Sequence, residues 1–590
     1  KIDFYNNSSV NNITGGLLQL GNGSSGAAKT FHIRGTAPEV VLTSTSGNHN
    51  CNLAGALTIM GDLETSGTGF FSTNGQSLTV AGMNAGNPGN IFIGTGGVLT
   101  LNTLATGALA FTGSYGNQAL TNNGTITAGQ TAGLRISNTY PGGTVTLPVG
   151  LVMMGDATLE LAAGNLVTGT GITLGTGGTS GFTYIQGDGT STGTITRNYG
   201  SGIVNYTYNG NTPRTTGSEL PAVISGTLAI GNPAGVTLAT SLQAGKLNLS
   251  AGVLITTTAN LLTITGTATG DVIYTGGMVQ GPLQRTLPAA LAAGTTWLFP
   301  LGKSSYRPLE LVDPLTTAGT VVIRAEVFDG ATGGIAGPTM FSLDGIRYWQ
   351  TEITSGSGNF TGTSVRVTET GLNPNSGLAK SNSLAGIYDL VSVGPPSGNT
   401  LTSSSIPGAG YYTIGDKRMN YVSSTTTQAN TAYLREGSVN QEIIGLQIVT
   451  NGSLDPALLT SITFSTAGST LPADIASAKV YYTGTSSVFS TSTPFGSAFL
   501  TPTGSFNITG SQALAEGTNY LWLAFDISVG VTDNNVVDAE CLSVTVRGMS
   551  ATPSVTAPTG NRTVRAALTG IVTVGTGGSY PTLTGACGLF

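Results

Sequence analysis

The sequence has very few charged residues. Only 8% of its 590 residues are Asp, Glu, Lys or Arg, against about 25% in ordinary soluble domains. With 21 basic and 27 acidic residues, the net charge is −6 and the pI is about 5.0. The basic residues are scattered, whereas nucleic-acid-binding surfaces concentrate Lys and Arg in a patch or stripe. We therefore do not expect nucleic acid as a partner.

Cysteine and histidine are nearly absent. Cys51, Cys541 and Cys587 are far apart and form no CxxC spacing of the kind used for zinc or redox chemistry. We expect buried, unpaired thiols, although their disulfide status stays open. His32 and His49 are the only histidines, and they lie in no HxxxH or HExxH motif. No Ser/His/Asp set can be assembled either, so the sequence predicts no catalytic residues and no enzyme.

Long hydrophobic runs are also missing, which excludes a helix that spans a membrane. Hydrophobic residues nevertheless make up 39% of the chain, and the mean hydropathy is +0.18. That is enough apolar surface to offset chain entropy, so the 89 glycines do not imply disorder. The polar residues are mostly Thr, Ser and Asn, which suit half-exposed strands and turns. We therefore expect an all-β protein.

The first half of the chain repeats a loose unit, in which a short alternating strand is followed by Gly or Asn-Gly and another strand. Examples are GALTIMGDLETSG (55–67) and GKLNLSAGVLITT (245–257). Apolar residues at i and i+2 predict strands with one buried face. No Trp occurs before Trp297, and stacked coils favour small, repeated side chains. Residues 1–287 are therefore predicted to form a parallel β-helix or β-solenoid, with a β-sandwich as the alternative.

Aromatic residues and longer alternating strands begin after residue 287. TWLFPLGKSSYRPLEL (296–311) and IRYWQTEIT (346–354) predict an antiparallel β-sandwich over 288–417. AKVYYTG and NYLWLAFDI predict a second sandwich over 418–566. Residues 567–590 begin another strand pattern, which we interpret as the start of a further β-solenoid in a longer protein.

Several motifs occur in a familiar order in the second sandwich: NQEIIGLQI, AKVYYTGTSSVF, FGS, GTNYLWLAFDI and NVVDAECLSVTV. With them, residues 421–564 resemble the sialidase amino-terminal-like β-sandwich of multidomain surface proteins of Bacteroidota. WLFPLGKSSYRPLEL and GPLQRTLPA (281–289) resemble recurring pieces of large Bacteroidota adhesins. The resemblance implies an extracellular, repetitive protein exported by type IX secretion. Sialidase catalysis lies in a separate propeller with Asp boxes; no such box occurs here, so the resemblance implies no sialidase activity.

Tyrosines are the candidate contacts for a sugar. In NYTYNGN (205–211), Tyr206 and Tyr208 are expected on one face of a strand, where aromatic rings can stack on a glycan. Tyr411 and Tyr412 form a second pair. Ordinary packing or an exposed edge is the favoured interpretation of both pairs. Glycan contact by Tyr206 and Tyr208 is the functional alternative.

Paired carboxylates are the candidate metal ligands. Asp62 and Glu64 share a face of one strand, as do Asp156 and Glu160 if their strand is uninterrupted. A solvated edge is the favoured interpretation of each pair, so neither pair is predicted as a metal site. GDGTSTG (187–193) lacks the ligands of an EF-hand and the Lys of a P-loop, so it predicts a β-turn. No cofactor is expected, and a structural Ca²⁺ ion has no identifiable site.

Two functions follow as hypotheses. The first is a structural and adhesive segment of a large surface protein, a stalk or filament component at the cell surface that associates with itself, a surface or a polysaccharide. The second is a carbohydrate-binding accessory region of a secreted glycan-active enzyme. An enzymatic β-helix is the least favoured alternative, because the chain has so few carboxylates and histidines.

Overall fold

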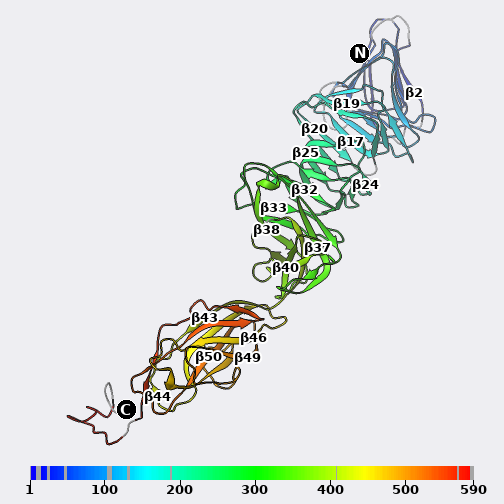
Figure 1. The fold of residues 1–590 in the computed structure, drawn as a ribbon. Helices are drawn as coiled ribbons and strands as arrows, with labels where there is room; N and C mark the ends of the chain where they lie inside the picture. Colours follow the sequence, from blue (N-terminus) through cyan, green and yellow to red (C-terminus); the bar gives the residue numbers. More distant parts are fainter. Residues whose placement is uncertain are drawn as a thin grey trace. The chain divides into compact units, whose positions relative to one another are not determined.

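The structure is a computed structural model. It describes residues 2–7, 13, 15–22, 27–45, 49–101, 109–128, 133–185, 189–406, 408–567 and 570–584. The fold is all-β, with 55% strand and 2% helix, and consists of a β-solenoid of about 11 turns followed by antiparallel sheets (Figure 1). The fold class predicted from the sequence is confirmed. Among the described residues, no helix is long and apolar enough to span a bilayer.

The chain forms two compact units. Unit 1 comprises Lys1–Thr332, Ile346–Thr370 and Gly398–Tyr412, and unit 2 comprises Gly333–Gly345, Gly371–Ser397 and Thr413–Phe590. The domain boundaries expected after residues 287, 417 and 566 stay predictions.

One parallel sheet runs the length of the solenoid in unit 1, and each coil adds one strand or two short ones. Its strands are β1 (Ile2–Asn6), β3 (Thr30–Ala37), β5 (Asn50–Ile59), β7 (Phe70–Ser72), β8 (Leu78–Val80), β10 (Val98–Leu101), β11 (Leu109–Phe111), β13 (Thr125–Ala128), β14 (Leu134–Ser137), β17 (Thr158–Ala163), β20 (Ser180–Ile185), β23 (Ile203–Tyr208), β25 (Val223–Ile230), β27 (Leu242–Leu249), β29 (Leu262–Ile264), β30 (Val272–Tyr274) and β32 (Leu283–Leu287).

Three shorter parallel sheets form the other sides of the coils. They contain β2 (Leu17–Leu20), β4 (Glu39–Ser44), β6 (Leu63–Gly67), β9 (Ile91–Ile93), β12 (Gln118–Asn122), β15 (Thr144–Thr146), β18 (Asn165–Val167) and β21 (Thr190–Thr192); then β16 (Val152–Gly155), β19 (Ile172–Gly177) and β22 (Ile195–Arg197); and then β24 (Arg214–Thr215), β26 (Val236–Thr237), β28 (Val253–Ile255) and β31 (Met278–Gln280).

The solenoid core consists of side-chain ladders that run from coil to coil. Because each strand alternates, residues i and i+2 both point inward, and parallel register places them on their counterparts in the next coil. One buried ladder comprises Leu57, Leu78, Leu109, Leu134, Leu159, Thr183, Tyr206, Leu228, Leu247 and Val272. The ladder beside it comprises Ile59, Val80, Phe111, Ile136, Leu161, Ile185, Tyr208, Ile230, Leu249 and Tyr274.

Glycine allows the coils to approach one another at their corners. Gly252 has a φ of 72°, and a Cβ atom there would lie 1.8 Å from the carbonyl oxygen of Asn232 in the preceding coil. A larger residue would therefore suffer both backbone strain and a clash. This explains part of the high glycine content.

The parallel pairing ends at β32, which pairs in parallel with β29 and antiparallel with β35 (Val321–Asp329). β35 pairs antiparallel with β37 (Met340–Ser355). A second antiparallel sheet contains β33 (Thr296–Phe299), β34 (Leu309–Thr316), β38 (Phe360–Thr368) and β41 (Thr400–Thr402). The solenoid sheet thus continues into the antiparallel part of unit 1 through backbone hydrogen bonds, and Figure 1 shows β33 and β38 following β32.

Unit 2 contains a two-sheet β-structure with an apolar core between its sheets. The strands are β43 (Asn420–Thr427), β45 (Gln441–Asn451), β50 (Gly517–Ile527), β47 (Ile475–Gly484) and β48 (Phe499–Leu500) in one sheet, and β49 (Ser505–Ala513), β46 (Leu458–Ser465), β52 (Glu540–Val546) and β53 (Met549–Ala551) in the other. Further strands are β36 (Ile335–Ala336), β39 (Ser376–Ser381), β40 (Ile387–Leu390), β42 (Gly410–Lys417), β44 (Leu434–Arg435), β51 (Val536–Val537) and β54 (Arg562–Arg565). The 3-10 turns of the chain are η2 (Thr269–Asp271), η3 (Ser357–Asn359) and η4 (Pro472–Asp474).

The start of a further β-solenoid over 567–590 stays a prediction. Residues 568–569 and 585–590 lie outside the described residues. In the described segment 570–584, a parallel bridge joins Val574 to Tyr580.

Two of the cysteines are buried free thiols, as expected. Cys51 lies in the solenoid core and Cys541 in the core of unit 2, and both are 0% exposed. Burial raises the pKa of each thiol to about 12. Cys587 lies outside the described residues.

Both buried thiols are expected to resist modification in the native protein, because neither the thiolate nor access is available. The measurement is reaction with a colorimetric disulfide reagent in buffer and in denaturant, on a Cys587→Ser variant. No reaction in buffer and two equivalents in denaturant are expected. Rapid reaction of either thiol in buffer would contradict the packing described here.

Candidate functional site

The structure corrects the hypothesis that Tyr206 and Tyr208 contact a glycan. Both rings share one face of β23, as expected, but that face points inward and both side chains are 0% exposed. They occupy the two apolar ladders, where Tyr208 lies between Ile185 and Ile230 of the neighbouring coils. Neither ring can stack on a sugar in this structure. Tyr412 is also buried.

Tyr208 belongs to a buried polar network inside the solenoid. Its hydroxyl donates a 2.9 Å hydrogen bond to Oε1 of Glu219, which is 1% exposed. Glu219 also accepts hydrogen bonds from the backbone N–H of Gly217 (2.8 Å) and the hydroxyl of Ser191 (3.2 Å). Burial, together with the Glu219 carboxylate, raises the pKa of Tyr208 well above its usual value. The hydroxyl therefore stays protonated as a donor.

Tyr208→Phe is expected to lower the free energy of unfolding of unit 1 by about 1–3 kcal/mol, because the buried carboxylate loses a donor. Tyr206→Phe is the matched control. The Tyr206 hydroxyl is buried and has no hydrogen-bond partner among the described residues, so its removal is expected to cost nothing. Denaturant unfolding of both variants provides the test, and equal losses would refute the role of the Tyr208–Glu219 bond.

The carboxylate pairs do not form a common site. Asp62 and Glu64 share the outward face around β6. Asp62 accepts a 2.6 Å hydrogen bond from the backbone N–H of Asn90, and burial raises the pKa of Asp62 despite that bond. Asp156 accepts the N–H groups of residues 179 and 180, which lower its pKa, whereas Glu160 pairs with Arg135 at 3.5 Å.

The other candidate features also have local partners. Nδ1 of His32 lies 3.2 Å from Asp3 on the adjacent strand, and Nδ1 of His49 accepts the backbone N–H of Lys29 at 3.3 Å. Gly187 and Asp188 of the GDGTSTG segment lie outside the described residues. Across the described ranges, no group of three or more His, Cys, Asp or Glu is placed to hold a metal ion.

A pocket lies within unit 1, between the last coils of the solenoid and the first antiparallel strands. Its volume is about 370 Å³, within the range of about 300–1,000 Å³ typical of ligand pockets. The solenoid contributes three threonines and a proline, and β35, β37 and the loop before β34 contribute the rest. The lining residues are Thr256, Thr257, Thr258, Pro282, Lys303, Arg324, Glu326, Phe328, Gln350 and Glu352.

The floor of the pocket is the outward face of β35 and β37. Arg324, Glu326 and Phe328 alternate with buried residues along β35 and therefore share that face. In the antiparallel register, Arg324 lies opposite Glu352 and Glu326 lies opposite Gln350. Arg324 forms an ion pair with Glu352, and Nζ of Lys303 lies 3.0 Å from Oε1 of Glu326.

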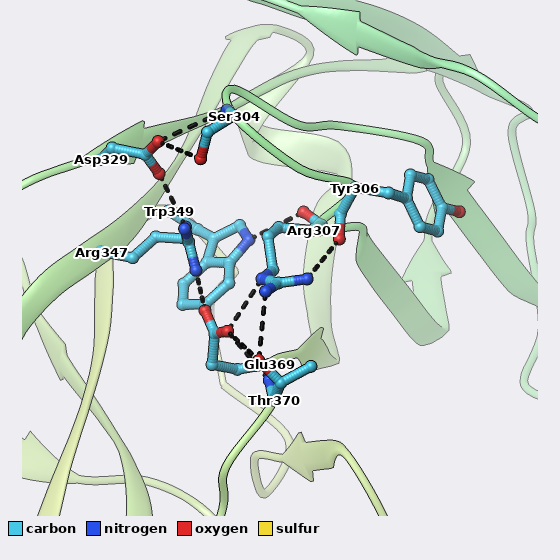
Figure 2. Close-up of polar contacts among 8 residues, drawn as sticks. All are labelled: Ser304, Tyr306, Arg307, Asp329, Arg347, Trp349, Glu369 and Thr370. Atoms are coloured by element: carbon cyan, nitrogen blue, oxygen red, sulfur yellow. Dashed lines mark hydrogen bonds and ion pairs between the residues drawn. The ribbon is translucent and has the colours of Figure 1, made fainter.

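A network of ion pairs, the junction network, fixes the loop that carries Lys303. It consists of Ser304, Arg307, Asp329, Arg347, Trp349 and Glu369 (Figure 2). Nε of Arg307 lies 2.8 Å from Oε1 of Glu369, and Nη1 of Arg347 binds Oε2 of the same carboxylate.

The junction network also extends to the neighbouring strands. Nε of Arg347 lies 2.9 Å from Oδ1 of Asp329, which accepts a 2.8 Å hydrogen bond from the Ser304 hydroxyl through Oδ2. Nε1 of Trp349 donates to the carbonyl oxygen of Arg307 at 3.1 Å. Burial lowers the pKa of Arg347, but its two carboxylates outweigh burial and hold the pKa above the usual value. The loop is thus tied to β35, β37 and the end of β38.

Two aromatic contacts join the same region to the last solenoid coils. The guanidinium of Arg285 lies 4.7 Å from the centre of the Trp297 ring, and its nitrogens donate to the carbonyl oxygens of Leu298 (2.8 Å) and of Ala268 and Thr269 (3.1 Å each). The Arg285 side chain is 0% exposed, and burial lowers its pKa to about 10. Tyr306 stacks on Tyr274 of β30, with ring centres 4.3 Å apart.

The segments of this region stand out in the sequence, but the pocket does not. GPLQRTLPA contains Arg285, and WLFPLGKSSYRPLEL contains Trp297, Lys303 and Arg307. The alternation in VVIRAEVFD (321–329) and IRYWQTEIT (346–354) was a usable signal of the pocket floor, since it places charged and amide side chains on one face. It gave no indication of which strands are neighbours.

No protein-family model matches the chain, and no curated protein sequence is significantly similar to it. The resemblance of residues 421–564 to a sialidase amino-terminal-like sandwich stays a prediction.

Proposed function

We propose that this chain is a structural and adhesive segment of a large extracellular surface protein, in which it forms part of a stalk or filament. The type IX export and Bacteroidota origin implied by the resemblance belong to the same proposal.

The continuous backbone pairing of unit 1 carries this proposal. About 11 coils, spaced roughly 4.8 Å apart, extend over roughly 50 Å. The last solenoid strand β32 pairs directly with β35, so hydrogen bonding continues from the coils into the antiparallel strands. In-register ladders give such a rod stiffness with little charge, because each coil packs over its whole length on its neighbours. A stalk needs this property, and it needs no active site.

Surface location can be tested with antibodies raised against the purified chain. Intact cells of the source organism are expected to bind these antibodies without permeabilisation. An antibody to a cytoplasmic protein serves as the control for cell integrity. Labelling that appears only after permeabilisation would refute the extracellular location.

Self-association is part of the proposal, and the first coil supports it. Among the described residues, β1 and β2 are edge strands of their sheets. Ile2, Tyr5 and Leu17 are 50%, 47% and 54% exposed there. Exposed apolar side chains that lie together favour contact with another chain. Leu17→Lys is expected to reduce association in sedimentation experiments, and an unchanged distribution of oligomers would argue against this edge.

The pocket favours a second candidate function, a carbohydrate-binding accessory region of a secreted glycan-active enzyme. Mass spectrometry of the native full-length protein separates the two candidates. A catalytic glycosidase or lyase domain in the same polypeptide would favour the accessory role, and further solenoid repeats would favour the stalk.

A further inference from the structure

The pocket of unit 1 contains accessible polar groups that its own ion pairs do not use. Gln350 lies half-buried on β37, and among the described residues its side-chain amide has no hydrogen-bond partner. Thr258 is exposed at the opposite wall. Oε1 of Glu326 binds Lys303, and Gln350 lies opposite Glu326 on the paired strand. The pocket therefore offers donors and acceptors side by side.

The charges of the pocket cancel. Lys303 and Arg324 are its cations, and each is already paired with a carboxylate, Glu326 or Glu352. A phosphate or a uronate would need to break one of these pairs to gain a partner, and a cationic ligand would meet the same obstacle. The electrostatics thus favour a neutral ligand whose polarity comes from hydroxyl groups.

The walls of the pocket are held in place before a ligand arrives. Phe328 stacks on Tyr348, with ring centres 4.7 Å apart, and Nζ of Lys303 lies 5.4 Å from the centre of the Phe328 ring. Pro282 adds a second apolar surface. The junction network fixes the loop of Lys303, as described above. A preorganised pocket loses less conformational entropy on binding than a flexible one.

We propose that this pocket binds a neutral sugar unit of a polysaccharide. The Glu326 carboxylate and the Gln350 amide receive adjacent hydroxyl groups, Thr258 contacts the opposite side of the ring, and Phe328 and Pro282 pack against its C–H groups. The inference names the class of ligand for the proposed adhesive function. It rests on that function only in taking the sugar to be part of a polysaccharide outside the cell.

Saturation-transfer NMR on the full chain tests the site, with glucose, galactose, mannose, fucose and N-acetylglucosamine as neutral probes and with glucuronic and sialic acid as charged comparators. At least one neutral sugar is expected to bind, and Gln350→Ala is expected to weaken that binding roughly tenfold, the loss of about one hydrogen-bonded group. Gln447→Ala is the matched control, because Gln447 is also half-buried on a strand but lies outside the pocket.

Three results would overturn the inference. They are no binding of any neutral sugar at a concentration of about 10 mM, binding of the acidic sugars alone, or equal binding by the Gln350→Ala and Gln447→Ala variants. Circular dichroism of both variants shows whether they are folded. Because the assay uses purified protein and free sugars, its failure would leave the antibody test of surface location unaffected.

Discussion

Replacing Arg285 by Ala is expected to lower the free energy of unfolding of unit 1 by about 3–5 kcal/mol. The buried guanidinium supplies hydrogen bonds to three carbonyl oxygens at the end of the solenoid and packs on Trp297. The variant removes these three hydrogen bonds and opens a cavity beside the indole. Both effects act where the parallel coils meet the antiparallel strands, so the loss is expected to spread over unit 1.

Tryptophan fluorescence during denaturant unfolding measures this effect. Trp297 and Trp349 lie in unit 1 and Trp522 lies in unit 2, so a Trp522→Phe background makes the signal specific for unit 1. Arg135→Ala is the control, because the Arg135 side chain is 44% exposed and pairs with Glu160 at 3.5 Å. Exposed ion pairs contribute about 0–1 kcal/mol. Equal losses for Arg285→Ala and Arg135→Ala would refute the role given to Arg285.

Glu369→Gln is expected to destabilise unit 1 by about 3 kcal/mol. The carboxylate is 12% exposed and lies between two guanidinium groups, those of Arg307 and Arg347. Without this negative charge, the two guanidinium groups stay close together and lose a carboxylate that they share. Breaking a buried ion pair from one side costs about 3–5 kcal/mol. The same change is also expected to weaken sugar binding, since the loop of Lys303 loses its anchor.

Glu352→Gln is the matched control for stability. Its carboxylate pairs with Arg324 but is 46% exposed, so the expected loss is about 0–1 kcal/mol. The same Trp522→Phe background and the same denaturant titration apply. A Glu369→Gln variant as stable as Glu352→Gln would show that the junction network does not stabilise unit 1.

The strand pattern of the solenoid was predictable because it is local. Alternation with period 2 and glycines at corners recur along the coils, although the buried ladders contain large side chains such as Phe71 and Phe111. Tyr206 and Tyr208 show the limit of the pattern. Alternation places both rings on one face of β23 but does not say which face is inside. Only the pairing of Tyr208 with Ile185 and Ile230 shows that the ring belongs to the core.

The pocket was not predictable for a related reason. The pattern of β35 places Arg324, Glu326 and Phe328 on one face, yet it does not reveal that Gln350 lies opposite Glu326. The position of Gln350 depends on the register of β37. The positions of the pocket threonines Thr256, Thr257 and Thr258 depend on the way the solenoid ends. Such non-local pairings are set by packing of the whole unit and leave no signal in a short window of sequence.

Negative-stain electron microscopy of the native, full-length protein on and off the cell is the decisive test of the stalk. We expect long thin fibres or beaded stalks at the cell surface, with stiff segments at least as long as the roughly 50 Å solenoid. Compact particles without extended segments would contradict the stalk and favour an accessory region of a secreted enzyme.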